Sequence, residues 1–198
     1  MRELILKMSM SLDGFVSDLE GTNKWMFGAD PEAKAWAVEL TWNASLHIMG
    51  SRSFLVMAPF YPTSTIEFAA PMNQIPKAVF SKRGPAILET VKAATPSEGL
   101  LPGAESWAEA YVASGDLAEE IAALKAQDGK PIIAHGGVSF VRSLIAVGLV
   151  DQFVLGVHPI ALGKGLPLFS ELAAPMPLRL VHSKAFPGGA IAQVYRPA

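Results

Sequence analysis

Short apolar runs, separated by polar segments with helical spacing, recur along most of the chain. The clearest run covers 131–134, is followed by Gly136 and Gly137, and leads into apolar residues at helical spacing from Val141 onward. A short, continuous apolar run is typical of a parallel strand that is covered on both faces. The pattern therefore predicts a buried strand that turns directly into a helix at two glycines.

The other runs predict the remaining strands and the helices. Strands are expected at 4–10, 46–49, 77–80, 108–113, 152–160, 178–186 and 190–196. Helices are expected after the N-cap candidates Asp30 and Asp116, after Gly50, and briefly near 88–93, whereas the proline-rich segment 58–76 should hold at most a short helix. A Pro-Gly-Gly turn joins the last two strands, which predicts a C-terminal hairpin. The fold class is therefore α/β, with a mainly parallel sheet and an antiparallel edge.

Two of the predicted strand ends carry features that suit a phosphate. Gly136 and Gly137 lack a Cβ, so a ligand can approach the backbone, and the following helix start presents unpaired amides and a positive dipole end. Gly50 ends another strand and is followed by Ser51, Arg52 and Ser53. Such glycine motifs also serve simply to connect strand and helix, and the Gly136-Gly137 dipeptide by itself favours this simpler interpretation.

Three further features are candidates for a site. Asp13 lies in the Ser-Leu-Asp-Gly loop after the first strand, where it could act in catalysis or form an Asx turn. Ser81, Lys82 and Arg83 follow the strand at 77–80, where two cations beside a hydroxyl could bind a phosphate or form a solvated turn. Trp36, on the predicted first helix, is expected in the core or in the wall of a pocket.

Composition narrows the classes of protein. The 198 residues are 51% hydrophobic and 17% charged, which predicts one compact domain over 1–198. The net charge of −2 provides no general attraction to nucleic acid or to anionic membranes. No apolar run reaches the length of a membrane span, and no secretory signal is evident, so the expectation is a soluble cytoplasmic protein. The histidines are scattered without carboxylates at ligand spacing, and no metal site is expected.

The motifs together resemble a known family. They are Ser11-Leu12-Asp13-Gly14, the residues from Gly50 to Phe54, those from Lys77 to Lys82, Asp116-Leu117, His135-Gly136-Gly137, and His158-Pro159 through Phe169. In this order they resemble the reductase domain of bacterial riboflavin biosynthesis, the RibD C-terminal domain, which is related to dihydrofolate reductase. The resemblance implies a three-layer fold with helices on both faces of the sheet and NADPH bound across the strand ends. It also implies hydride transfer to a small pterin-, pyrimidine- or ribosyl-type substrate, and a homodimer.

The resemblance assigns roles to the candidate residues. It places the cofactor against His135, Gly136, Gly137, Val138 and Ser139, against Gly50, Ser51, Arg52 and Ser53, and against Ser81, Lys82 and Arg83. Asp13 is implied near the nicotinamide and the substrate, as a catalytic or substrate-orienting group. Trp36, as a candidate for the pocket wall, is also a candidate substrate contact. Relatives usually carry arginine where this chain has Ser51, so Arg52, Lys82 and Arg83 would have to supply the preference for NADPH over NADH.

Three functional classes follow. The first is an NADPH-dependent reductase. The second is a non-catalytic module that binds NADP(H) or another ligand in the same fold, because Asp13 is the only well-placed acid. The third, a structural or interaction protein, agrees least with the polar and glycine-rich strand ends. A fused zinc deaminase is excluded within this chain, because its signature needs cysteines and the chain has none.

Overall fold

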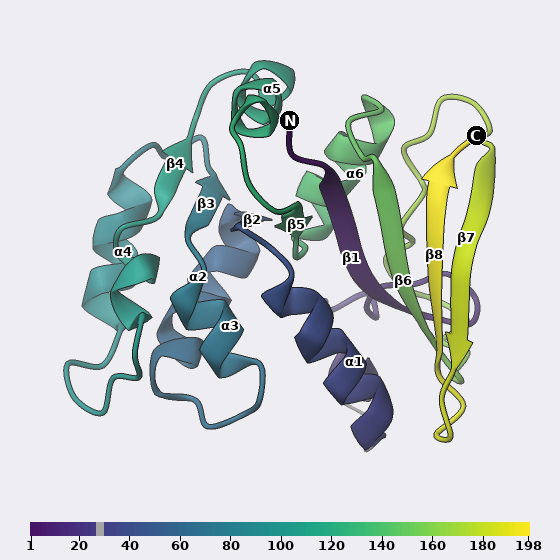
Figure 1. The fold of residues 1–198 in the computed structure, drawn as a ribbon, viewed down its shortest axis with the longest axis horizontal. Helices are drawn as coiled ribbons and strands as arrows, with labels where there is room; N and C mark the ends of the chain where they lie inside the picture. The colour runs from purple at the N-terminus through teal and green to yellow at the C-terminus, as the bar shows by residue number, and fades with distance from the viewer. Residues whose placement is uncertain (27–29) are drawn as a thin grey trace.

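The computed structural model describes residues 1–26 and 30–198, and it is built around one sheet (Figure 1). The strands are β1 (Leu4–Ser11), β2 (Leu46–Gly50), β3 (Lys77–Phe80), β4 (Tyr111–Ala113), β5 (Ile132–Ala134), β6 (Gln152–His158), β7 (Leu178–Ala185) and β8 (Ile191–Pro197). Their spatial order is β4-β3-β2-β5-β1-β6-β8-β7. Pairing is parallel from β4 to β6 and antiparallel at β6–β8 and β8–β7. The predicted mainly parallel sheet with a closing hairpin is confirmed.

Helices cover both faces of this sheet. They are α1 (Pro31–Trp42), α2 (Ser51–Phe60), α3 (Ala69–Gln74), α4 (Ala86–Ala94), α5 (Leu117–Ala126) and α6 (Val138–Ala146). Helices α5 and α6 pack on the face that carries Leu4, Leu6 and Ile48. Helix α1 packs on the opposite face through Trp36 and Leu40, where α2 and α4 also lie over Met49 and Val79. This arrangement follows from right-handed crossovers, because the chain runs one way along the sheet before α5 and the other way afterwards.

The predicted N-caps are confirmed. The Asp30 carboxylate accepts hydrogen bonds from the amides of Glu32 and Ala33, and that of Asp116 from the amides of Ala118 and Glu119. Each cap satisfies amides that the first turn of a helix leaves unpaired. The residues at which α1 and α5 begin are therefore encoded locally.

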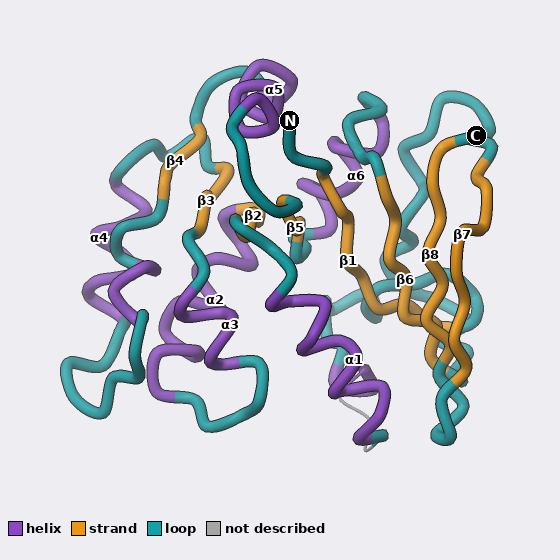
Figure 2. The backbone as a smooth tube through the Cα atoms, viewed as in Figure 1, coloured by secondary structure: helices purple, strands orange, loops and turns teal. Residues whose placement is uncertain are grey.

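Two local expectations need correction. The predicted strand at 108–113 forms only from Tyr111, because the preceding residues Ala104–Trp107 make a 3-10 turn that buries Trp107 against Asn73. The chain between α4 and β4 is mostly loop (Figure 2). Helix α2 also continues to Phe60 through Pro59, where burial of Ala58 holds the last turn. The short helix expected within 58–76 is α3.

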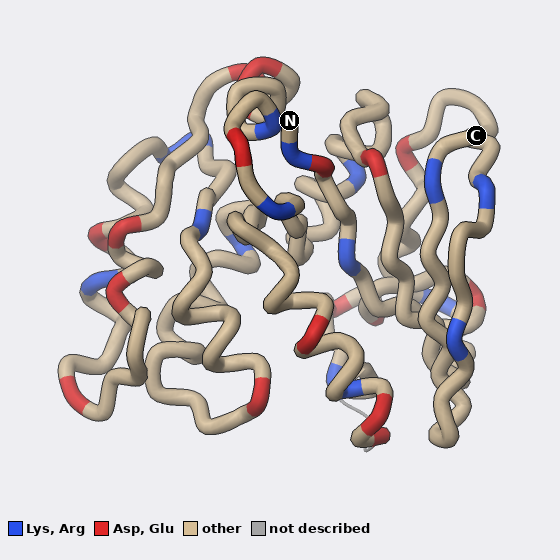
Figure 3. Tube along the Cα trace, in the orientation of Figure 1, with Lys and Arg blue, Asp and Glu red and all other residues tan. Residues whose placement is uncertain are grey.

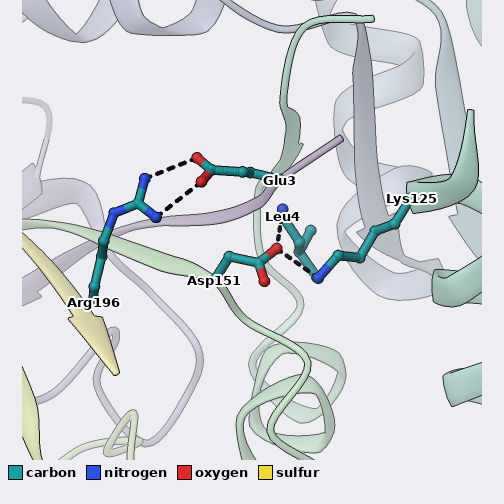
Figure 4. Close-up of polar contacts among 5 residues, drawn as sticks. All are labelled: Glu3, Leu4, Lys125, Asp151 and Arg196. Atoms are coloured by element: carbon teal, nitrogen blue, oxygen red, sulfur yellow. Dashed lines mark hydrogen bonds and ion pairs between the residues drawn. The ribbon is translucent and has the colours of Figure 1, made fainter. Parts of the chain in front are cut away.

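Polar contacts secure the amino end of β1 (Figure 4). The Asp151 carboxylate accepts from the Leu4 amide at 2.7 Å and pairs with the Lys125 ammonium at 2.6 Å. Arg196 forms a bidentate pair with Glu3, at 2.8 and 2.9 Å. The first strand is thereby joined to α5, to the start of β6 and to β8. Opposite charges are interspersed along the rest of the described chain (Figure 3), and none of its helices is long and apolar enough to span a membrane.

Candidate functional site

The two glycine junctions lie side by side at the carboxyl-terminal edge of the sheet. The Gly50 amide donates to the Gly136 carbonyl at 3.2 Å. A Cβ on Gly137 would lie 3.4 Å from the Gly50 Cα and 3.5 Å from the Ser53 Oγ, and the Gly137 φ of +79° is one that side-chain-bearing residues rarely adopt. These positions therefore require glycine for local geometric reasons, whatever they bind.

Two helix starts meet at this edge. Helix α2 begins at Ser51 directly after Gly50, and α6 begins at Val138 directly after Gly137. Neither helix has a side-chain cap, so their first amides have no capping acceptor. Unpaired amides and aligned backbone dipoles make such a pair of helix ends suitable for a pyrophosphate. The predicted cofactor residues Ser53, Val138 and Ser139 lie in these first turns.

A basic turn flanks the two helix starts. Phe80 pairs with Gly50 across β2 and β3, so the following residues Ser81, Lys82 and Arg83 lie beside the start of α2. Ser81 is buried and its hydroxyl accepts from the Arg83 amide at 3.2 Å. Arg52, Lys82 and Arg83 are exposed, and within 1–26 and 30–198 none of them is in an ion pair. Their charges are available to a ligand phosphate.

Asp13 is hydrogen-bonded on both carboxylate oxygens. Its Oδ1 accepts from the Ser11 hydroxyl at 2.6 Å and from the Leu162 amide at 3.1 Å, and its Oδ2 accepts from the Gly163 amide at 2.7 Å. The Ser11 hydroxyl, followed by the Gly163 amide, holds the pKa of this exposed carboxyl below its usual value. The side chain joins the loop after β1 to the loop after β6, which favours loop positioning over proton transfer.

Trp36 occupies a core position on the inner side of α1. Its ring centroid lies 6.0 Å from that of Phe186, and it packs against the cluster that contains Ile5, Ile133 and Val154. The partly buried Trp36 thus packs against the core, and its predicted contact with a substrate stays a prediction. Its contact with Phe186 joins α1 to the end of the C-terminal hairpin.

The sheet face toward α1 carries a basic row that was not predicted from the sequence. Four basic side chains follow one another across adjacent strands, and we call them the basic row. They are Lys7 on β1, His135 after β5, His47 on β2 and Lys77 on β3. His135 Nε2 lies 2.8 Å from His47 Nδ1, and the pair of rings is edge-to-face. The His135 side chain, predicted at the cofactor, is thus engaged with His47 on the face opposite α6. The sequence does contain one indication of this polar face, because Lys7, Ser9 and Ser11 alternate with Met8 and Met10 along β1.

Burial shapes the charges in the basic row. Desolvation, followed by the neighbouring lysines, lowers the pKa of His47 to about 3, and desolvation followed by His47 lowers that of His135 well below its usual value. Both imidazoles are therefore neutral near pH 7. Burial also lowers the pKa of Lys77 to about 7. The Lys77 ammonium donates to the carbonyls of Asn73 and Ile75 and to the Ser106 hydroxyl.

Lys7 differs from the other members of the row. Its Nζ lies 5.2 Å from the centroid of the Phe68 ring, and burial lowers the pKa of Lys7 to about 8. In the part of the chain that the structure describes, no carboxylate pairs with it. A partly desolvated cation without a counterion is suited to hold a polar or anionic substrate atom, or to give up a proton near neutral pH. No group of histidine and carboxylate side chains among the described residues is placed to hold a metal.

Comparisons with known proteins agree with this architecture. The family model of the RibD C-terminal domain matches residues 2–192. The protein YyaP of Bacillus subtilis is 28% identical over 194 residues, which make up 98% of this chain and 94% of YyaP.

Two solved structures show the fold. The diaminohydroxyphosphoribosylaminopyrimidine deaminase/5-amino-6-(5-phosphoribosylamino)uracil reductase of Thermotoga maritima has a TM-score of 0.69 at 18% identity, over 100% of this chain and 57% of its own. A dihydrofolate reductase of Enterococcus faecalis, solved with NADP(H), has a TM-score of 0.61 at 13% identity, over 98% of this chain and 96% of its own. Because the family model covers nearly the whole chain, this protein belongs to the RibD C-terminal domain family, and its fold is that of dihydrofolate reductase.

Proposed function

We propose that the protein is an NADPH-dependent reductase that acts on a small pyrimidine-, pterin- or ribosyl-type substrate. The observation that carries the proposal is the close approach of Gly50 and Gly137, which brings two uncapped helix starts together at one edge of the sheet. Two structures with the same fold add support, since one is a deaminase and uracil reductase and the other was solved with NADP(H).

The residues at this edge fit NADPH. The amides at the starts of α2 and α6 would hold the pyrophosphate, and Arg52, Lys82 and Arg83 would bind the 2′-phosphate through charge-assisted hydrogen bonds. Their freedom from ion pairs within the described residues leaves these cations available. When bound, NADPH supplies the hydride for reduction.

The protein's own groups would orient the substrate. Lys7 would donate a hydrogen bond, and in the reaction a proton, to a substrate oxygen or nitrogen, because it is a partly buried cation without a carboxylate partner among the described residues. We assign Asp13 to positioning, since its hydrogen bonds hold the loops after β1 and β6 together at the same edge. Neutral His135 and His47 would keep the neighbourhood of Lys7 free of further positive charge.

A second candidate is a module that binds NADP(H) without turnover. The saturated hydrogen bonding of Asp13 favours it, because this carboxylate has little freedom to exchange protons. Calorimetric titration with NADPH, followed by NADPH oxidation across a panel of pterins, pyrimidines and ribosylated pyrimidines, separates the two. Turnover with at least one substrate supports the reductase, and tight binding without oxidation of any supports the module.

Substitution of Lys7 then tests the assignment of the substrate side. Lys7→Met keeps most of the side chain's length and apolar contact but removes the ammonium. We expect NADPH affinity to stay the same while turnover falls by about 100-fold, the scale of one acid–base group. Unchanged turnover would remove Lys7 from the substrate site.

A further inference from the structure

A cavity lies at the amino-terminal edge of the sheet, opposite the glycine junctions. Leu46 and Lys77, the first residues of β2 and β3, form its floor, and α5 lies along one side. Its volume is about 450 Å³, within the roughly 300–1,000 Å³ typical of small-molecule sites. Figure 1 shows α5 at the top of the view, near the N-terminus and the beginning of β1.

The inner wall of the cavity is mainly apolar. Leu46 and Leu124 are buried core residues that border it, and Ala123 on α5 is exposed along its side. The one cation in the lining, Lys77, is 2% exposed, and its three ammonium hydrogens are used by the carbonyls of Asn73 and Ile75 and by the Ser106 hydroxyl. A ligand in the cavity would therefore meet an apolar wall rather than a free ammonium group.

The polar rim offers carboxylate acceptors. Glu120 accepts from the Tyr111 hydroxyl at 2.7 Å and from the Gly115 amide at 3.0 Å, and this contact raises the pKa of Tyr111, which stays protonated as a donor. The exposed Glu109 carboxylate forms neither an ion pair nor a hydrogen bond within 1–26 and 30–198. The amide oxygen of Gln127 is occupied by Arg2, at 2.7 Å. The groups left to a ligand at the rim are thus mainly negative.

We propose that this cavity binds a small amphipathic amine, with its apolar body against Leu46, Ala123 and Leu124 and its ammonium group at Glu109 and Glu120. An aromatic ring on a short alkylamine fits within this volume and matches the arrangement of an apolar wall beside a carboxylate rim. The site is separate from the proposed cofactor edge by the length of β2, which has five residues, so its first and last Cα atoms are about 13 Å apart at ~3.3 Å for each of the four steps between them. It does not depend on the proposed reductase activity.

The test uses three probes of the same shape, namely 2-phenylethylamine, 3-phenylpropionate and the neutral 2-phenylethanol. Binding is followed by chemical-shift changes of backbone amides in β4 and α5 of the whole protein. We expect the amine to bind with a dissociation constant in the millimolar range or below, and the acid at least about tenfold more weakly, because the carboxylate rim attracts one charge and repels the other.

Two variants locate the site. Ala123→Phe should fill the cavity from the exposed side of α5 and abolish amine binding, and circular dichroism verifies that the variant folds. Glu109→Gln should lower the affinity for the amine about three- to tenfold without changing the affinity for 2-phenylethanol. Glu119→Gln is the control, because Glu119 is an exposed carboxylate on α5, the helix beside the cavity, but does not line the cavity.

Each alternative result counts against the proposal. Equal affinity for the amine and the acid would overturn it, and so would amine binding that survives Ala123→Phe. The proposal would also fail if Glu119→Gln lowered the affinity for the amine as much as Glu109→Gln does. Displacement of the amine by saturating NADPH would contradict the separate location. Failure of NADPH to bind would affect only the proposed reductase function, so the two proposals can fail independently.

Discussion

His135 Nε2 lies 2.8 Å from His47 Nδ1, so two imidazoles from neighbouring parallel strands share a hydrogen bond on the α1 side of the sheet. His47 is fully buried, and its Nε2 has no hydrogen-bond partner in the described part of the protein. Lys7 and Lys77 lie on the strands to either side, and both lower the pKa of the histidines. A pair in this setting is stable only when neutral.

This pair should make the protein acid-sensitive. The folded-state pKa of His47 is about 3, below the unfolded value of roughly 6.5. The unfolded chain therefore binds more protons between these values, and stability is lost as the pH falls below about 6.5, by up to ~1.4 kcal/mol per pH unit for each histidine. Urea unfolding at about pH 7 and about pH 5 measures the loss. His47→Leu should reduce this dependence, and an equal dependence in both proteins would contradict the assignment.

Gly137→Val should abolish NADPH binding. The valine Cβ would lie 3.4 Å from the Gly50 Cα, in the space that a pyrophosphate at the two helix starts would need. The matched control is Gly148→Val, because Gly148 also has a positive φ, of +68°, but no atom lies within 4 Å of its added Cβ. Both variants should lose roughly 1–3 kcal/mol of stability from backbone strain. If calorimetry shows NADPH binding lost equally in both, the loss reflects strain and not the site.

Lys82→Ala combined with Arg83→Ala should reduce the preference for NADPH over NADH. Each charge-assisted contact to the 2′-phosphate contributes roughly 1.5–3 kcal/mol, or about ten- to a hundredfold in affinity. NADH affinity should hardly change, since NADH lacks that phosphate. Lys130→Ala is the control, an exposed lysine at the opposite edge of the sheet. If the double variant still preferred NADPH to NADH, the basic turn would contact only solvent and not the 2′-phosphate.

Asp13→Asn should loosen the junction between the loops after β1 and β6. The variant loses one carboxylate acceptor, so the contact with the Leu162 and Gly163 amides weakens, and limited proteolysis within 159–167 should become faster. Turnover should fall while the shape of its pH profile stays the same. Asp18→Asn is the control, because Asp18 holds the Thr22 amide within the same early loop. Loss of one limb of the pH profile in Asp13→Asn would instead indicate proton relay.

The edge strand β7 is the expected contact of a homodimer. Its neighbouring side chains Leu180 and Val181 are 51% and 47% exposed, and an exposed apolar edge strand is a ready partner for a second copy. Light scattering should give twice the 21.0 kDa mass of one chain, and Val181→Glu should give the single mass. Val56→Glu, at a 68% exposed position on α2, should leave the mass unchanged. A single-chain mass for the unaltered protein would exclude the dimer.

The sequence by itself determined most elements of the fold and the place of the glycine junctions. Strands β3 and β5, the caps Asp30 and Asp116, and the closing hairpin depend on residues close together in the chain. The same holds for Gly137, whose positive φ is a local requirement that few other residues meet. Strand β4 was predicted too long because burial of Trp107 beside Asn73, more than thirty residues away, outweighed local preference.

Only the tertiary structure decided which side chains meet. The Asp13 carboxylate accepts hydrogen bonds from amides that lie 149 and 150 residues further along the chain. The His135 ring is hydrogen-bonded to that of His47, which lies 88 residues earlier. The path of the hairpin placed Phe186 beside Trp36, a contact that the local pattern around Trp36 did not show. These contacts follow from the spatial strand order β2-β5-β1-β6, which differs from the order in sequence, so local patterns could place each residue on a strand end or face without showing its neighbour.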